Sequence, residues 1–164
     1  MTRTVTRPVS LEQSYRTAMG NVASPVAVVT AFDGEAPHGT TVSAFTSLSM
    51  EPPMLLVSLD NNSALLPRLE AGVRFGLNVL ASHQDQIALR FAQKRERKFE
   101  DIPWYADDLA PRIVDAHAWV ALDVTSRIVA GDHTIVTGMV AAAQASIGTP
   151  LTYYQRSFGT HRTF

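Results

Sequence analysis

Residues 26–49 read VAVVTAFDGEAPHGTTVSAFTSLS, and this stretch decides the fold class. Its first seven residues are rich in β-branched side chains, and Asp33 with Gly34 then forms a pair typical of a tight turn. Residues 38–42 can pair back as a second strand. The stretch therefore predicts an antiparallel hairpin within a β-rich domain.

Further short strands follow this hairpin along the chain. Residues 54–59 and 74–80 have strand composition, and residues 119–129 and 134–143 flank a tight turn at 130–132. Strands do not alternate with long helices, so a doubly wound parallel sheet is not expected. The pattern favours a mainly β fold, an antiparallel barrel whose strand edges are hidden by closure.

Only a few short helices are expected beside these strands. Each begins near a serine that can accept a hydrogen bond from the first turn. The expected helices cover residues 11–19 and 64–69, with Ser10 and Ser63 as their caps, and a third that follows Ser82 as its cap and runs to about residue 92.

Length and composition indicate one globular domain over residues 1–164, with 46% hydrophobic and 18% charged residues. The net charge of -1 gives no electrostatic reason to expect a nucleic-acid or membrane-surface partner. The absence of cysteine excludes disulfides, thiolate metal sites and cysteinyl-flavin links. Residues 1–8 lack the apolar region of a signal peptide, and the uncharged residues 134–155 are too polar to span a membrane. We therefore expect a cytoplasmic protein.

Several common catalytic signatures are missing. The chain has no glycine-rich dinucleotide fingerprint after a strand, no P-loop and no nucleophile elbow. Its five histidines lie far apart in the sequence, so no metal site is expected.

The densest unusual feature is residues 40–49, of which six carry hydroxyls and none is charged. Hydroxyls and free backbone N–H groups suit a ligand with many neutral polar edges, and they can also hold a phosphate. The alternative is a Ser/Thr-rich strand and turn whose hydroxyls satisfy the local backbone. Composition alone does not decide between these interpretations.

Two further segments could bind an anion. Residues 58–63 lie between a strand and an expected helix N-terminus, where a phosphate could bind, although Ser63 could simply cap the helix. Residues 90–99 contain five basic side chains, which indicate either an anion site or a solvated helix end.

Taken in order, these segments resemble the short-chain flavin reductase family, the reductase components of two-component flavin monooxygenases. The resemblance covers residues 14–159. It is carried by residues 41–49 (TVSAFTSLS), 52–53 (PP), 56–60 (LVSLD), 75–80 (FGLNVL), 90–92 (RFA), 98–99 (KF), 130–135 (AGDHTI) and 150–154 (PLTYY).

The resemblance implies a split β-barrel that binds flavin, and a homodimer. It implies that residues 41–49 line the isoalloxazine and ribityl chain, that residues 60–63 flank the phosphate with Lys98, and that residues 153–156 close the site. The implied flavin-binding residues are Thr41, Val42, Ser43, Ala44, Ser47, Leu48, Ser49, Asp60, Asn61, Asn62, Ser63, Asn78, Lys98, Phe99, Tyr153, Tyr154 and Arg156.

The resemblance also implies that His133 meets the nicotinamide, where it could orient the carboxamide or supply a proton. The alternative is a surface histidine that follows a hairpin turn.

The expected activity is NAD(P)H-dependent reduction of FMN, with FAD as the alternative flavin and NADH or NADPH as the hydride donor. An oxygenase component would receive the reduced flavin. Two other functions stay open: reduction of another acceptor, such as a corrinoid or ferric complex, and flavin binding without catalysis.

Overall fold

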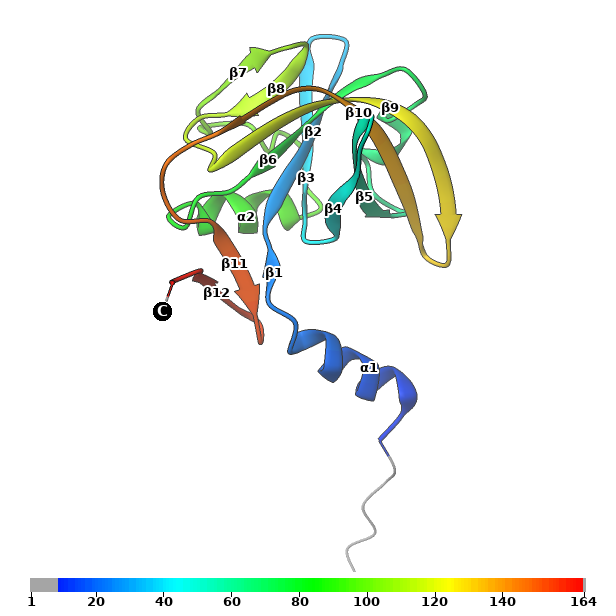
Figure 1. Ribbon diagram of the computed structural model, residues 1–164, viewed down its shortest axis with the longest axis vertical. Coiled ribbons are helices and arrows are strands. Elements are labelled where there is room, and N and C mark those ends of the chain that lie inside the picture. Colours follow the sequence, from blue (N-terminus) through cyan, green and yellow to red (C-terminus); the bar gives the residue numbers. More distant parts are fainter. Residues whose placement is uncertain (1–8, 164) are drawn as a thin grey trace, which may run out of the picture.

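The computed structural model describes residues 9–163, so residues 1–8, where no signal peptide is expected, lie outside the description. Short strands dominate, as the sequence predicts (Figure 1). The elements in chain order are α1 (Leu11–Gly20), β1 (Ser24–Pro25), β2 (Ala27–Asp33), β3 (Ala36–Val42), β4 (Phe45–Met50), β5 (Pro53–Asp60), the 3-10 helix η1 (Leu66–Arg68), β6 (Arg74–Val79), α2 (Asp85–Ala92), β7 (Trp104–Asp107), β8 (Ala110–Ile113), β9 (Ala118–Ala130), β10 (His133–Ala145), β11 (Leu151–Tyr154) and β12 (Ser157–Thr160).

Seven strands form the main sheet, in the order β3-β2-β6-β9-β10-β5-β4. All of its pairings are antiparallel, and the sheet curls into a barrel (Figure 1). Its two edge strands, β3 and β4, are joined by Ser43 and Ala44 alone. The expected antiparallel β-barrel is thus confirmed, and the hydroxyl-rich segment occupies the corner between its two edges.

The valine-rich strand β2 is buried on both faces, which explains why Thr30 is the one polar side chain among its first six residues. Val29 packs in the core inside the sheet, together with Phe75 and Leu122. Val28, on the opposite face, packs in a second core with Phe91 of α2. The strand that decides the fold therefore lies between two cores and joins them.

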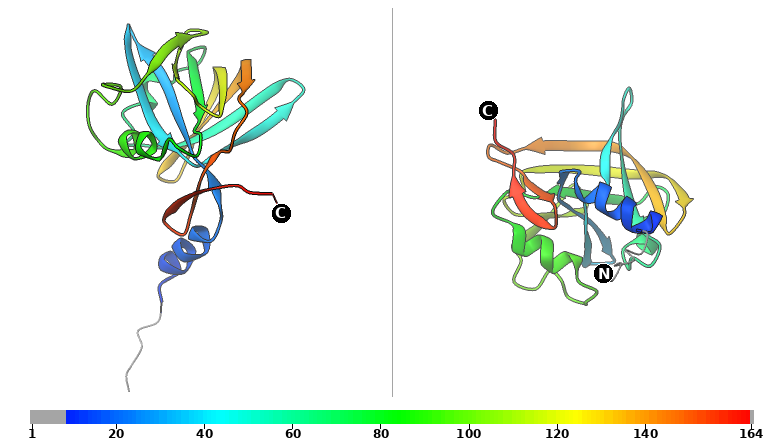
Figure 2. Two further views of the ribbon diagram at one scale, coloured as in Figure 1. Left: turned by 90° about the vertical axis from the view of Figure 1, so that its left-hand side faces the viewer. Right: turned by 90° about the horizontal axis from the view of Figure 1, so that it is seen from below.

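A smaller sheet and a helix project from the barrel (Figures 1 and 2). The order of this sheet is β1-β11-β12, and β1 leads directly into β2. Helix α1 begins after Ser10, whose Oγ accepts a hydrogen bond from the Gln13 N–H, and it buries none of its residues. We call α1 with β11 and β12 the arm.

Two of the expected helices differ in the structure. Residues 64–69 form only the short η1, because Pro67 lacks the N–H that an α-helix needs there. Helix α2 forms, but the Ser82 hydroxyl accepts a hydrogen bond from Thr149 instead of capping the helix. No helix within residues 9–163 is long and apolar enough to cross a membrane.

Candidate functional site

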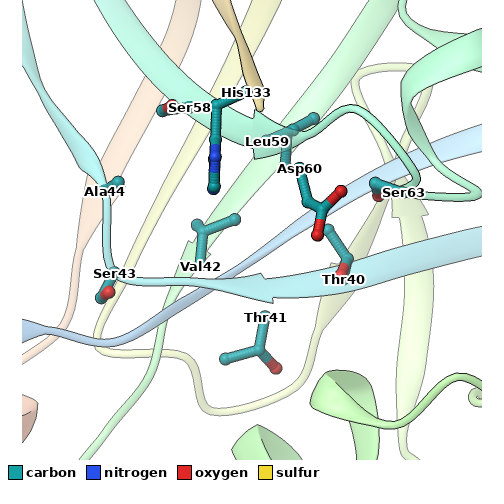
Figure 3. Close-up of a pocket in the computed structure, with 10 residues that line it drawn as sticks. All are labelled: Thr40, Thr41, Val42, Ser43, Ala44, Ser58, Leu59, Asp60, Ser63 and His133. Carbon is teal, nitrogen blue, oxygen red and sulfur yellow. The ribbon is translucent and has the colours of Figure 1, made fainter. Parts of the chain in front are cut away.

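A cleft of about 220 Å³ opens at the corner between β3 and β4 (Figure 3). One wall is the end of β3 with Ser43 and Ala44, and the other is the end of β5 with the start of β10. The pairing of His133 with Asp60 in the β10–β5 register brings the last two elements together. The lining residues are Thr40, Thr41, Val42, Ser43, Ala44, Ser58, Leu59, Asp60, Ser63 and His133.

Side-chain alternation along β3 decides which of its side chains face the cleft. Thr40 and Val42 point toward the opposite wall, whereas Thr41 points away from it (Figure 3). The Thr41 hydroxyl donates a hydrogen bond to the Ala88 carbonyl of α2 at 2.7 Å. Thr41 thus fixes β3 to the helix behind the cleft.

Lys98 reinforces the same attachment. Its ammonium donates hydrogen bonds to the carbonyls of Gly39, at 3.2 Å, and Phe91, at 2.9 Å. Burial lowers the pKa of this half-buried lysine from its ordinary value. Lys98 therefore holds the wall of the cleft from behind rather than lining it.

Asp60 is the acid among the ten lining residues. Its Oδ1 accepts hydrogen bonds from the Asn62 backbone N–H at 2.7 Å and from Asn62 Nδ2 at 3.1 Å. The backbone hydrogen bond from Asn62 is the main reason that the pKa of Asp60 lies below its ordinary value. This wall thus carries a carboxylate near neutral pH, and Asn62 serves as its partner.

Asn61 points the other way, toward the turn between β9 and β10. Its backbone N–H donates to the Asp132 carbonyl at 3.0 Å, and its Nδ2 donates to the Gly131 carbonyl at 3.2 Å. Its Oδ1 accepts a hydrogen bond from the Thr134 hydroxyl at 2.8 Å. Three hydrogen bonds therefore join the end of β5 to the turn that carries His133.

His133 enters the cleft from the first position of β10 (Figure 3). Its Nδ1 lies 2.8 Å from Oδ1 of the neighbouring Asp132. The hydrogen bond to His133 is the main cause of the lowered pKa of Asp132. The hairpin thus presents an imidazole to the cleft, and its Nδ1 already has a hydrogen-bond partner in Asp132.

Comparison with known proteins identifies the family. Residues 19–162 match the model of the flavin reductase like domain. The chain belongs to the flavin reductase family. It is 34% identical over 159 residues to the reductase component of a 4-nitrophenol 4-monooxygenase/4-nitrocatechol 2-monooxygenase from Rhodococcus opacus, with 97% of this chain and 85% of that protein covered.

Two further proteins similar to this flavin reductase are also named as enzymes that use NADH and a flavin. An FMN reductase (NADH) from Agrobacterium fabrum, SmoA, is 35% identical over 148 residues, with 90% of this chain and 84% of that protein covered. The solved structure of Streptomyces globisporus NADH:FAD oxidoreductase SgcE6, in complex with NAD and FAD fragments, superposes with a TM-score of 0.85. Its sequence identity is 28%, and the match covers 97% of each chain.

The chemistry of the cleft fits a flavin. Five of its lining residues carry a neutral hydroxyl: Thr40, Thr41, Ser43, Ser58 and Ser63 (Figure 3). That of Thr41 is bound to α2, and the backbone of Ala44 lies at the corner. Flavin has several neutral polar edges, which such groups can bind without burying charge. Within residues 9–163 no group of three or more His, Cys, Asp or Glu side chains could hold a metal ion.

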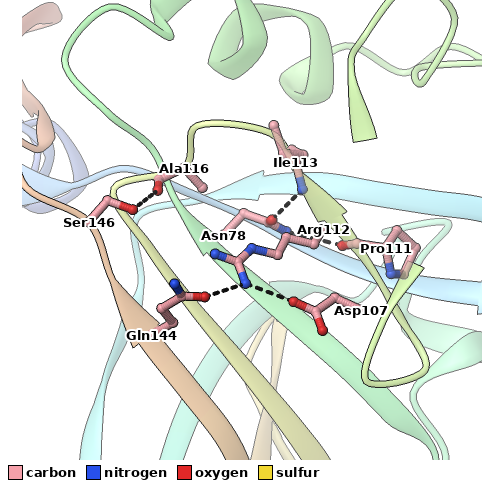
Figure 4. Close-up of polar contacts among 8 residues, drawn as sticks. All are labelled: Asn78, Asp107, Pro111, Arg112, Ile113, Ala116, Gln144 and Ser146. Atoms are coloured by element: carbon pink, nitrogen blue, oxygen red, sulfur yellow. Dashed lines mark hydrogen bonds and ion pairs between the residues drawn. The ribbon is translucent and has the colours of Figure 1, made fainter. Parts of the chain in front are cut away.

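Two residues expected at the flavin lie in the interior instead. Asn78 is 0% exposed and does not line the cleft. Its Oδ1 accepts the Ile113 N–H of β8 (Figure 4). Its Nδ2 donates to the Val28 carbonyl of β2, so Asn78 joins the two strands. Phe99 packs edge-on against Phe91, with ring centroids 4.8 Å apart, and belongs to the second core.

The β4 residues expected at the flavin lie beyond the lining of the cleft. Ser47 and Leu48 are exposed, and the Ser49 hydroxyl accepts a hydrogen bond from the Glu51 N–H. These side chains are open to a ligand or to a second chain.

Tyr153, Tyr154 and Arg156 lie on the arm, in a different sheet from the cleft walls. Both tyrosines are exposed, and the Tyr153 ring packs against Phe158, with ring centroids 5.2 Å apart. Within one chain the arm therefore does not close the cleft.

Three lining residues were missing from the sequence-based set. Ser58 and Leu59 directly precede Asp60 at the end of β5, and Thr40 lies two places before Val42 on the same face of β3. Alternation of side chains could have found Thr40 from Val42 and Ser58 from Asp60, but not Leu59, which lies on the other face of β5.

A second and larger cleft, of about 380 Å³, lies beside the N-terminus of α2. It is lined by three loops and contains His83, Asp115 and His117. It shares no lining residue with the first cleft, and none of the expected flavin-binding residues lies in it.

Proposed function

We propose that this chain, as a single domain, is an NAD(P)H:flavin oxidoreductase that reduces FMN and releases it to an oxygenase component. One observation carries the proposal: in a member of the flavin reductase family, the corner cleft combines neutral hydroxyls, backbone groups and one histidine. Supporting it, one relative is named as a reductase component of a monooxygenase and another as an FMN reductase (NADH).

In this proposal the cleft binds two ligands, the flavin and the nicotinamide. Val42, Ser43 and Ala44 would face the flavin ring, with Ser58 and Ser63 along the opposite wall. The two bound cofactors themselves supply the hydride chemistry. The protein needs only to align them and to place donors where negative charge collects on the reduced ring.

Steady-state oxidation of NADH, with and without added FMN, tests the activity. A reductase that supplies free flavin needs the added FMN, and turnover should rise with its concentration. Turnover without added flavin would indicate an enzyme with another acceptor, and no turnover in either case would indicate a flavin-binding protein. Replacing FMN by FAD, and NADH by NADPH, in the same assay ranks the ligands.

We further propose that His133 contacts the nicotinamide. Replacing it by alanine should then lower kcat/KM for NADH and leave the flavin dissociation constant nearly unchanged. One positioning hydrogen bond is worth roughly 1–3 kcal/mol, which corresponds to about 5- to 150-fold in rate. Stopped-flow bleaching of the flavin isolates this step, and an unchanged rate in the variant would refute the assignment.

The functional unit is a homodimer in this proposal. The cleft of about 220 Å³ is smaller than the roughly 300–1,000 Å³ of typical small-molecule sites, so one chain offers only part of an enclosure. Large apolar side chains are exposed on the arm and on strands β4 and β9, where a second copy could cover them. They include Leu11, Tyr15, Met19, Leu48, Met50, Ile128, Val129, Tyr153 and Tyr154.

In such a dimer the arm of one chain would reach the cleft of the other, which gives Tyr153, Tyr154 and Arg156 the closing role that the resemblance implies. Static light scattering at micromolar concentration should return twice the mass of one chain. A single-chain mass would contradict the dimer and leave the flavin site without its cover.

A loosely held flavin and a cytoplasmic location complete the proposal. Neutral donors and a single acid in the cleft favour reversible binding, and a micromolar dissociation constant corresponds to about -8 kcal/mol. Flavin should therefore leave the protein during dialysis. Flavin that stays bound through extensive dialysis would contradict transfer to an oxygenase.

A further inference from the structure

The turn that carries His133 is built with more contacts than a hairpin turn needs. Gly131 and Asp132 form the two-residue link between β9 and β10, and the strands already pair on both sides of it. Asn61 nevertheless adds three hydrogen bonds from another strand, about 70 residues away in the sequence. The additional contacts fix the position of the turn relative to the wall of the cleft.

We propose that Asn61 and Asp132 are positioning residues that present His133 as a hydrogen-bond acceptor to the carboxamide N–H of a nicotinamide. The proposal rests on the assignment of His133 to the nicotinamide, made above. It chooses between the two roles open to His133, because an acceptor nitrogen orients the carboxamide and has no proton to supply.

Asp132 determines which nitrogen accepts. An ionised carboxylate can only accept hydrogen bonds, so the His133 Nδ1 that lies 2.8 Å from it must carry the hydrogen. In the neutral ring, Nε2 then keeps its lone pair. This nitrogen lies at the free end of a side chain that points into the cleft (Figure 3).

Among the described residues, Asp60 also lies near the ring, but no hydrogen bond joins its carboxylate to His133. Asp60 pairs with His133 across the two strands, but its Oδ1 accepts both of its hydrogen bonds from Asn62. The low pKa of Asp132 is consistent with a carboxylate that stays ionised while it holds the ring. The nearest described carboxylates therefore have separate tasks.

Asn61 fixes the turn itself. Its Nδ2 and backbone N–H hold the two carbonyls of the turn, and its Oδ1 holds the Thr134 hydroxyl on the other side of His133. Both polar atoms of this side chain are thus bound to the turn. We expect Asn61 to act on the nicotinamide step rather than on flavin affinity.

A tautomer measurement tests the proposal without turnover. In protein labelled with ¹⁵N-histidine, two-dimensional NMR should show the neutral His133 ring in the Nδ1–H form. Asp132→Ala should shift it toward the Nε2–H form, and Asp132→Asn should preserve it, because the amide oxygen still accepts from Nδ1. An Nε2–H ring in the unmodified protein would overturn the proposal, whether or not the protein oxidises NADH.

A cofactor analogue tests the acceptor role. Reduced 3-acetylpyridine adenine dinucleotide keeps a ring carbonyl but lacks the amide N–H groups. His133→Ala should slow hydride transfer from NADH by about fivefold or more, since one hydrogen bond is lost. It should slow transfer from the analogue by less than about twofold. An equal loss with both cofactors would mean that His133 donates to the carbonyl, and would overturn the proposal.

Variants of the two positioning residues, Asn61 and Asp132, complete the test. Asn61→Ala and Asp132→Ala should each lower kcat/KM for NADH by about three- to tenfold, because each loosens one hydrogen-bonded support. The flavin dissociation constant should stay within about twofold, while Asp132→Asn should retain most of the rate. The matched control is Asp101→Asn, which removes an exposed carboxylate outside the cleft. Flavin affinity that falls together with the NADH parameters in Asn61→Ala would show that Asn61 serves the flavin instead.

Discussion

Replacing Asn78 by alanine should destabilise the fold and leave the flavin site largely intact. Its Nδ2 lies 3.2 Å from the Val28 carbonyl, and its Oδ1 accepts the Ile113 N–H at 2.7 Å (Figure 4). Without the carboxamide, the Ile113 N–H is buried and has no partner, which costs about 1–3 kcal/mol. The space that is left adds about 1 kcal/mol, so we expect a loss of roughly 2–4 kcal/mol in the free energy of unfolding.

Urea denaturation followed by far-ultraviolet circular dichroism measures this loss. A protein of this size loses roughly 2–4 °C of Tm per kcal/mol, so the melting point should fall by about 5–15 °C. Flavin affinity is then measured by fluorescence quenching well below the transition. The exposed Gln86→Ala is the control for removing an amide, and it should change stability by less than about 0.5 kcal/mol.

The opposite pattern would refute this assignment. If Asn78→Ala keeps nearly all of its stability and binds flavin tenfold more weakly, Asn78 contacts the flavin, as the resemblance implies. A protein that is destabilised but binds flavin normally supports the internal role.

Three further predictions concern the supports of the barrel. In Gly39→Ala the new Cβ would lie 2.8 Å from the Phe91 ring, so overpacking should cost about 1–3 kcal/mol in denaturant unfolding and also weaken flavin binding, because the adjacent wall of the cleft must shift. Burial first, and then Arg68, lowers the pKa of His38 below 6.5, so the unfolded chain binds this proton more readily than the folded one. Stability should therefore fall as the pH drops through about 6.5 toward the lower folded value. The difference in unfolding free energy between wild type and His38→Asn, measured across that range, should show this slope, and a flat difference would contradict it. Arg112 Nη1 donates to Asp107 at 2.7 Å and to Gln144 at 2.8 Å, while the guanidinium lies over the Trp119 ring. Lysine has no planar group that can stack on that ring. Arg112→Lys should thus speed amide exchange in β7 and β8, and unchanged protection there would argue against the clamp.

Much of the fold could be predicted because local chemistry and tertiary structure agree. The valine-rich β2 and the hairpin around Gly131 have strand composition, and their turn residues suit the backbone they adopt. The sequence did not predict strand β4 within the hydroxyl-rich segment, because serine and threonine occur in both turns and strands. Ser82 has the sequence of a cap, but Thr149 from a distant loop holds its hydroxyl.

The site was less predictable, because most of its organisation depends on which distant elements meet. Asn78 lies on a strand whose two faces are both buried, so alternation along the sequence cannot tell an inward position from one that lines a cleft. The partners of Asn61 lie in a turn about 70 residues away. The sequence pointed to segments that contribute to the lining of the cleft, but pairing between strands decides which of their side chains face it.

The distribution of charge links the architecture to the proposed exchange of flavin. The Lys98 ammonium donates hydrogen bonds to the backbone of β3 and α2 and does not line the cleft. Asp60 adds a negative charge to one wall, which opposes tight binding of a phosphate beside it. Affinity for flavin must then come from neutral contacts at the corner between β3 and β4 and from the part of the dimer that covers the cleft. A cover supplied by the arm of a second chain can open without unfolding the barrel, which suits a flavin that enters oxidised and leaves reduced.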